Sequence, residues 1–267
     1  MARVRALLFR AVPRVLGWVA SWWPRIALLT SDAVVSMWAW TTSWPSRAVL
    51  RALFPTDDMS RIERRIRSTQ LRTQILASWI RRHGAGPARG LVRRHEAIAR
   101  LQPPMILGTF HVGPVLALGV IAEWLSAETL VLRGPQFAAG AAENVTLVEG
   151  TEQQRAATFH RAIERLSDGF VLVALDPRDA PRITVPFFGG TLRLARGPFA
   201  MARIRRVPLV PVVARWDGHA IELIAGDPLP PSDDETALAA AAARWLEGYL
   251  REWPGEMSSR VLELMEG

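Results

Sequence analysis

Short apolar runs alternate with helical stretches along the chain from residue 104 onward. The runs predict strands at Met105–Phe110, Thr129–Arg133, Val145–Glu149, Phe170–Leu175, Pro208–Ala214 and Ala220–Ile224. The stretches between them predict helices at Val115–Leu125, Glu152–Leu166, Pro198–Arg205 and Glu235–Trp253. This alternation is typical of an α/β fold in which helices flank a central, mostly parallel sheet. Only Arg215–His219 separates the last two strands, so we expect an antiparallel hairpin at one edge of the sheet.

An amphipathic helix is predicted between Asp57 and Arg82. Its apolar positions recur near the helical period and are Ile62, Ile66, Leu71, Ile75 and Ile80. Asp57 and Asp58 supply N-cap chemistry before it, and His83–Pro87 contains the Gly and Pro residues that end it.

Residues 1–54 contain two apolar segments on either side of Pro24 and Arg25. Arginines interrupt the first segment, and the second, Ile26–Trp44, is long enough to span a bilayer but contains Asp32. We therefore predict a membrane-associating, monotopic or interfacial helical segment at 1–54, followed by an α/β domain at 55–267. The alternative is a helical hairpin that packs on that domain.

Charge is unevenly distributed along the chain. The net charge is +8, and all 33 basic residues are Arg. Residues 1–100 carry 18 Arg against five acidic residues, whereas the remainder carries 15 Arg against 20 acidic residues. A basic first part indicates an anionic partner, which is either nucleic acid or an anionic membrane face.

The distribution of tryptophan favours the membrane. Six of the 11 Trp residues precede residue 45, where they are mixed with Arg and apolar residues. Trp beside Arg on an apolar segment is typical of the bilayer interface. A nucleic-acid partner rests on charge alone, because no recognition motif accompanies it. The absence of Cys excludes disulfides and thiolate metal sites.

Candidate chemistry lies where predicted strands end, since ligands of open α/β sheets bind at the carboxyl ends of strands. His111 follows the first strand and precedes a helix, so it is placed to act as a general base, with Gly113 beside it in the substrate site. Asp176 follows another strand in the same way. Each residue has a plainer interpretation, as a loop or core histidine and as an aspartate that opens a turn.

A third candidate is the segment Ile183–Gly190. Phe187, Phe188 and Gly189 could line an apolar cleft, or they could be ordinary core and turn residues. We expect a basic rim for phosphate or carrier-protein contacts from Arg133, Arg193 and Arg196, because Arg pairs well with phosphate oxygens. Ordinary surface arginines are the alternative.

These segments occur in an order that resembles a known family. The similarity is carried by Thr184–Gly189, Arg196–Pro198, Val207–Val212, Leu53–Pro55 and Glu96–His111, and it covers most of residues 45–250. The chain resembles the bacterial lauroyl/myristoyl acyltransferases of lipid A biosynthesis, which belong to a lysophospholipid acyltransferase-like superfamily.

The resemblance implies an O-acyltransferase. Such an enzyme moves an acyl chain from acyl carrier protein or coenzyme A to a hydroxyl of a membrane lipid or glycolipid, at the cytoplasmic face of the inner membrane. It implies no cofactor beyond the thioester co-substrate and no nucleic-acid partner. The family's catalytic His is followed five positions later by Asp or Glu, and here His111 matches whereas Leu116 does not.

The missing carboxylate leaves two hypotheses open. Asp176 is the preferred substitute, because it is expected at the same sheet edge as His111; Glu123 is expected to be remote. A catalytically silent homologue that binds lipid or acyl carrier protein is the alternative. The closing Trp and Arg cluster of the family is also replaced, by Gly255–Ser259.

Overall fold

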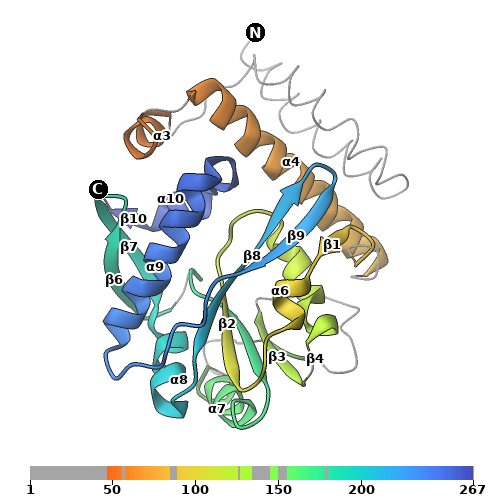
Figure 1. Ribbon diagram of the computed structural model, residues 1–267, viewed down its shortest axis with the longest axis vertical. Helices are drawn as coiled ribbons and strands as arrows, with labels where there is room; N and C mark the ends of the chain where they lie inside the picture. Colours follow the sequence, from red (N-terminus) through yellow and green to blue (C-terminus); the bar gives the residue numbers. More distant parts are fainter. Residues whose placement is uncertain are drawn as a thin grey trace.

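The computed structural model describes residues 47–55, 58–84, 89–125, 127–133, 145–149, 155–177 and 180–266 (Figure 1). Both apolar segments of the predicted N-terminal anchor lie outside these residues, whereas its last part, from residue 47 onward, is described. Within the described ranges, no helix has both the length and the apolar character needed to cross a bilayer.

A seven-stranded sheet forms the centre of the fold, in the order β1-β9-β8-β2-β5-β3-β4. Its strands are β1 (Val92–Arg94), β2 (Met105–Thr109), β3 (Thr129–Arg133), β4 (Val145–Glu149), β5 (Phe170–Ala174), β8 (Leu209–Asp217) and β9 (Ala220–Ala225). All neighbouring strands are parallel except β8 and β9, which form the predicted antiparallel hairpin. The α/β class with a mostly parallel sheet is therefore confirmed.

The central strands are apolar on both faces, as parallel strands covered by helices must be. Every residue of β2 is buried, and side chains alternate between the faces: Ile106 belongs to one core cluster and Leu107 to the other. The same alternation divides Val171 and Leu172 of β5 between the two clusters. The sheet thus separates two hydrophobic layers.

Helices cover these two layers. They are α3 (Arg47–Leu53), α4 (Met59–His83), α6 (Glu96–Ala99), η1 (Val115–Trp124), α7 (Arg155–Arg165), α8 (Arg196–Arg205), α9 (Glu235–Glu252), η3 (Pro254–Glu256) and α10 (Ser259–Leu264). The predicted helix at 57–82 is confirmed as α4, which Asp58 caps by accepting from the backbone amides of Ser60 and Arg61. α4 runs along one side of the molecule and contacts η3 and η1 (Figure 1).

A second, three-stranded sheet was not predicted from the sequence. It consists of β6 (Arg182–Phe187), β7 (Gly190–Ala195) and β10 (Met265–Glu266) in the antiparallel order β10-β7-β6. α9 packs on β6 and also contacts α8 and β8, so it lies between the two sheets (Figure 1). These strands alternate buried and partly exposed residues, and they therefore lack the continuous apolar run of a central strand.

Two local predictions need correction. The β8–β9 hairpin is not at the sheet edge, because β1 pairs with β9 outside it. β1 is only three residues long and has one buried residue, so no apolar pattern reveals it. The helix predicted at 115–125 is a 3₁₀ helix, η1, which is tighter than the α-helix that apolar periodicity suggests.

The hydrophobic core extends into the segment that the sequence assigned to a separate N-terminal part. Leu50, Leu53 and Phe54, from α3 and the residue after it, belong to the same core cluster as residues of β2 and α9. All three side chains are buried. The end of residues 1–54 is therefore part of the α/β core.

Candidate active site

The carboxyl ends of two neighbouring strands, β5 and β2, meet at one edge of the main sheet, and β8 runs on beyond them to Asp217. β2 lies in the middle, with Thr109 opposite Ala174 of β5 and Val212 of β8. His111 and Asp176 each come two residues after the end of β2 and of β5, and Gly218 follows β8 directly. This is the edge at which open α/β sheets bind ligands.

His111 projects from a tight turn. Phe110 and Val112 on either side of it are fully buried, and the Val112 amide donates to the Phe110 carbonyl at 2.8 Å across the turn. The His111 side chain is 38% exposed. The backbone is thus fixed in the core while the imidazole remains accessible to a substrate.

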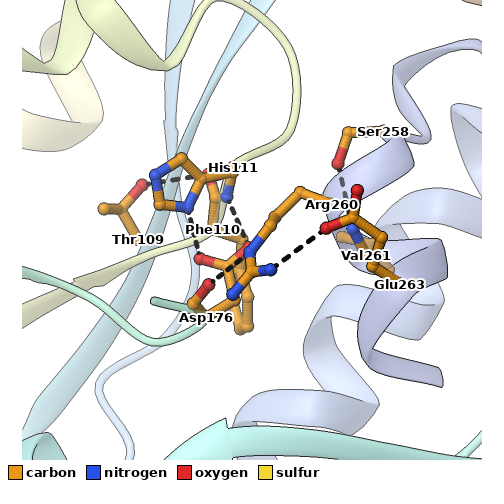
Figure 2. Close-up of polar contacts among 8 residues, drawn as sticks. All are labelled: Thr109, Phe110, His111, Asp176, Ser258, Arg260, Val261 and Glu263. Atoms are coloured by element: carbon orange, nitrogen blue, oxygen red, sulfur yellow. Dashed lines mark hydrogen bonds and ion pairs between the residues drawn. The ribbon is translucent and has the colours of Figure 1, made fainter. Parts of the chain in front are cut away.

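Asp176 contacts His111 through both carboxyl oxygens (Figure 2). Its Oδ2 accepts from the His111 amide at 2.9 Å, and its Oδ1 lies 2.7 Å from the ring Nδ1. Asp176 is 1% exposed. Because a carboxylate only accepts hydrogen bonds, this geometry assigns the proton to Nδ1 and leaves Nε2 as the basic nitrogen.

The backbone around Asp176 is held on both sides. The amide of Leu175 donates to the Thr109 carbonyl at 2.7 Å, and the Leu175 carbonyl accepts from the Ala195 amide at 2.8 Å. Nε of Arg260 donates to the Asp176 carbonyl at 2.9 Å, while its Nη1 bonds Glu263 at 3.2 Å (Figure 2). Arg260 comes from α10, and no motif in the sequence indicated that it would reach this site.

Gly113 has a structural reason to be glycine. Its φ is +57°, and a Cβ at this position would lie 2.2 Å from the Ala214 carbonyl oxygen and 2.7 Å from Oε2 of Glu256. The Thr73 hydroxyl of α4 donates to the Gly113 carbonyl at 3.5 Å. The turn after His111 is therefore packed closely between β8, α4 and η3.

A basic cavity of about 360 Å³ opens on the β8 side of this turn. We call it the α4–β8 cavity, and it is lined by Arg64, Arg65, Ser68, Thr69, Arg72, Trp216, Asp217, Gly218, Trp253, Gly255 and Glu256. None of these residues was predicted to belong to the site, because α4 was predicted only as an amphipathic helix.

Glu256 is the buried acid of the α4–β8 cavity. It is 7% exposed, and Thr69 Oγ1 donates to its Oε1 at 3.4 Å. Burial raises the pKa of Glu256 to about 7, against the opposing effects of Arg215, the Thr69 hydrogen bond, Arg72 and Arg65. A carboxyl of this kind is partly protonated at neutral pH, which is a common property of functional acids.

The segment from Phe187 to Gly189 forms the turn between β6 and β7. Phe188 and Gly189 have φ values of 49° and 79°, as a two-residue type I′ hairpin requires. Phe187 is buried in the core, and the Phe188 ring meets those of Phe54 and Phe187 edge to face. The Phe188 amide donates to Glu247 on α9 at 2.8 Å. This placement matches the core-and-turn interpretation of these residues.

The three arginines of the predicted rim lie on three different elements, β3, β7 and α8. Arg196 bonds Glu235 at 2.6 Å, and Arg203 bonds the same carboxylate at 2.9 Å. The hydrogen bond from Arg196 is the main cause of a lowered pKa at Glu235. Arg193 is half-buried on β7. Arg133 ends β3, and its side chain lies outside the described part of the chain.

Among the described side chains, no three His, Cys, Asp or Glu residues are grouped as metal ligands would be. The expectation that no metal takes part stays a prediction.

No protein-family model matches the chain, and no curated protein sequence matches it. The resemblance to the lauroyl/myristoyl acyltransferases therefore rests on the sequence motifs alone.

Proposed function

We propose that this protein is an O-acyltransferase that moves an acyl chain from a thioester to a hydroxyl of a membrane lipid or glycolipid. One observation carries the proposal: an exposed imidazole whose Nδ1 is held at 2.7 Å by a buried carboxylate. The order of motifs in the sequence supports the same reaction class. We further propose, from the Arg and Trp residues before residue 45, that it acts at the cytoplasmic face of the inner membrane.

In the proposed reaction, Nε2 of His111 removes the proton from the acceptor hydroxyl. The resulting oxygen attacks the thioester carbonyl, the C–S bond breaks, and the proton passes from His111 to the departing thiolate. Asp176 keeps the imidazole in the correct tautomer and stabilises its cationic form. The products are an ester and a free thiol, so the proton balance is closed.

Asp176 fills the role that the family motif gives to position 116. Leu116 lies in η1 and cannot accept a hydrogen bond from an imidazole. The separation of 65 residues between His111 and Asp176 is no obstacle, because adjacent parallel strands bring their ends together. The His111 imidazole therefore has a carboxylate partner although position 116 is Leu. This favours a working acyltransferase over a catalytically silent homologue.

The test is acyl transfer by the purified full-length chain. It is supplied with acyl coenzyme A or acyl carrier protein and with total membrane lipid, and both thiol release and new lipid esters are measured by mass spectrometry. We expect His111→Ala and Asp176→Asn each to reduce transfer by about 10³–10⁴-fold. His160→Ala is the matched control, because that histidine is 73% exposed on α7.

Two results would contradict the proposal. One is a His111→Ala variant with the full rate of the wild type; the other is a wild type that transfers from no thioester donor. Leu116→Glu provides the converse test and should give no gain, because Asp176 already holds Nδ1. A wild type without activity that gains it from Leu116→Glu would favour the silent homologue.

A further inference from the structure

We propose that the α4–β8 cavity binds the phosphate ester group of a substrate. Binding of a phosphate ester does not depend on the proposed acyltransferase function. Only the statement that the bound compound is a substrate rests on that function. The cavity, at about 360 Å³, lies in the range of about 300–1,000 Å³ that small ligands occupy.

Three guanidinium groups from one helix line the cavity. Arg64 and Arg72 are eight residues apart on α4, with Ser68 midway, so they lie on the same helix face; Arg65 is adjacent. Arg72 is 8% exposed and is fixed by a hydrogen bond to the Gly218 carbonyl. Guanidinium groups recognise phosphate oxygens through paired N–H donors, and fixed groups lose less entropy on binding.

Two acids in the wall do not cancel this positive charge. Asp217 is paired at 3.7 Å with Arg94, which is not part of the cavity. Burial raises the pKa of Glu256 to about 7, so this carboxyl is neutral in a large share of molecules at neutral pH. In its protonated form it adds a hydrogen-bond donor for an anion.

Tryptophan gives the cavity an apolar side. Trp216 is 8% exposed, and Trp253 is covered by the Arg215 guanidinium, 3.6 Å above its ring. A phosphate beside two indoles fits an ester whose organic part is apolar better than it fits a free inorganic ion. We therefore assign the cavity to a phosphate ester.

The cavity adjoins the turn that carries His111. Glu256 lines the cavity and also faces Gly113, whose added Cβ would lie 2.7 Å from its Oε2. Trp216 and Asp217 end β8, the strand that pairs with β2. A ligand with its phosphate in the cavity would thus lie beside the turn that carries His111.

Two substrates could supply the phosphate: the phosphopantetheine of the thioester donor, or a phosphorylated lipid acceptor. Isothermal titration calorimetry of the full-length chain distinguishes them with two pairs of probes. Coenzyme A is compared with pantetheine, and dihexanoyl phosphatidic acid with dihexanoylglycerol. In each pair only the first compound carries phosphate.

We expect at least one phosphate probe to bind and its phosphate-free counterpart to bind at least tenfold more weakly. Arg64→Gln combined with Arg65→Gln should weaken that binding by about tenfold or more, as loss of charged hydrogen bonds does. Both side chains are exposed, so the fold should survive, which circular dichroism checks. Arg61→Gln is the matched control, an exposed arginine of α4 outside the cavity, and should change affinity less than twofold.

The proposal is overturned if neither phosphate probe binds, if phosphate-free probes bind equally well, or if Arg61→Gln weakens binding as much as the double variant. These outcomes are separate from failure of the acyltransferase function. The wild type could lack transferase activity while it and His111→Ala both bind the phosphate probe. That result would retain the cavity assignment and remove the reaction. Conversely, the double variant could transfer acyl chains with the affinities and Michaelis constants of the wild type. That result would retain the reaction and remove the cavity assignment.

Discussion

At the scale of single residues, Asp176 fixes the backbone and the ring of His111 at the same time. One carboxyl oxygen accepts from the amide and the other from Nδ1. Replacing Asp176 therefore removes both the orientation of the ring and an anchor of the turn. For this reason the kinetic effect of Asp176→Asn needs to be compared with a measurement of stability before it is assigned to charge alone.

Glu256 should make stability depend on pH. Its pKa is raised from an ordinary 4.5 to about 7, so its protonated form is favoured in the folded state. The stabilisation is fully present below pH 4.5 and is lost as the pH rises to about 7. The wild type should thus be less stable at pH 8 than at pH 4.5 by about 3 kcal/mol through this group.

Glu256→Gln tests this dependence, because a neutral amide imitates the protonated carboxyl. The variant should exceed the wild type in free energy of unfolding at pH 8, and the difference should shrink towards pH 4.5. Urea denaturation at the two pH values measures it, with Glu252→Gln, an exposed acid of α9, as the control. A difference that is the same at both pH values would show that Glu256 is not the titrating group.

Arg260 should act as a positioning residue for Asp176. Its guanidinium holds the Asp176 carbonyl at 2.9 Å and is 14% exposed. In Arg260→Gln we expect kcat to fall on the order of tenfold with little change in KM, because substrate contacts are kept while the imidazole is less well oriented. Arg260→Lys should restore part of kcat.

Steady-state kinetics and thermal unfolding separate this role from a structural one. A loss of Tm without a loss of kcat would assign Arg260 to stability alone. Arg251→Gln is the control, since that exposed arginine of α9 pairs with Glu247 and makes no contact with Asp176 or His111 among the hydrogen bonds described above.

At the scale of elements, the β6–β7 turn offers a clean test of backbone conformation. Gly189 has a φ of +79° and Gly197, in the first turn of α8, does not have a positive φ; an added Cβ meets nothing within 4 Å at either position. Gly189→Ala should destabilise the protein by about 1–3 kcal/mol. Gly197→Ala should be neutral or stabilising, by up to about 1 kcal/mol. Equal effects in thermal unfolding would contradict the type I′ assignment.

Helices and strands could be predicted where their burial leaves a continuous pattern of apolar residues in the sequence. β3 and β4 match their predicted bounds, and α4 begins and ends within two residues of its predicted range. β6 and β7 were missed because a strand that is only partly buried alternates in polarity and contains turn residues. The 3₁₀ geometry of η1 could not be predicted either, since it depends on hydrogen bonds such as that from Ala117 to Pro114.

At the scale of the whole molecule, the contact between His111 and Asp176 could be predicted from the sequence. His111 and Asp176 both follow apolar strands, and the rule for parallel sheets is enough to bring them together. The α4–β8 cavity depends instead on how α4 and η3 pack against each other beside the end of β8. Arg64, Arg72 and Glu256 share no local motif, so only the packing of distant elements reveals them.

The N-terminal region should tolerate one truncation and not another. Deleting residues 1–45 leaves α3 in place, so the fold should persist, and we expect the protein to leave the membrane fraction. Deleting residues 1–54 also removes Leu50, Leu53 and Phe54 from the core, at about 1.5–3 kcal/mol for each side chain. Sedimentation and urea denaturation measure the two effects. A 46–267 chain that still sediments with membranes would place the anchor elsewhere.

The composition of the α4–β8 cavity has a consequence for proton exchange. Its cations are all arginines, which keep their charge throughout the physiological range, whereas Glu256 changes charge near pH 7. An anion placed beside Glu256 would further favour the protonated carboxyl. Ligand capture at neutral pH would therefore be coupled to proton uptake at Glu256, and this coupling makes the measured heat depend on the ionisation enthalpy of the buffer.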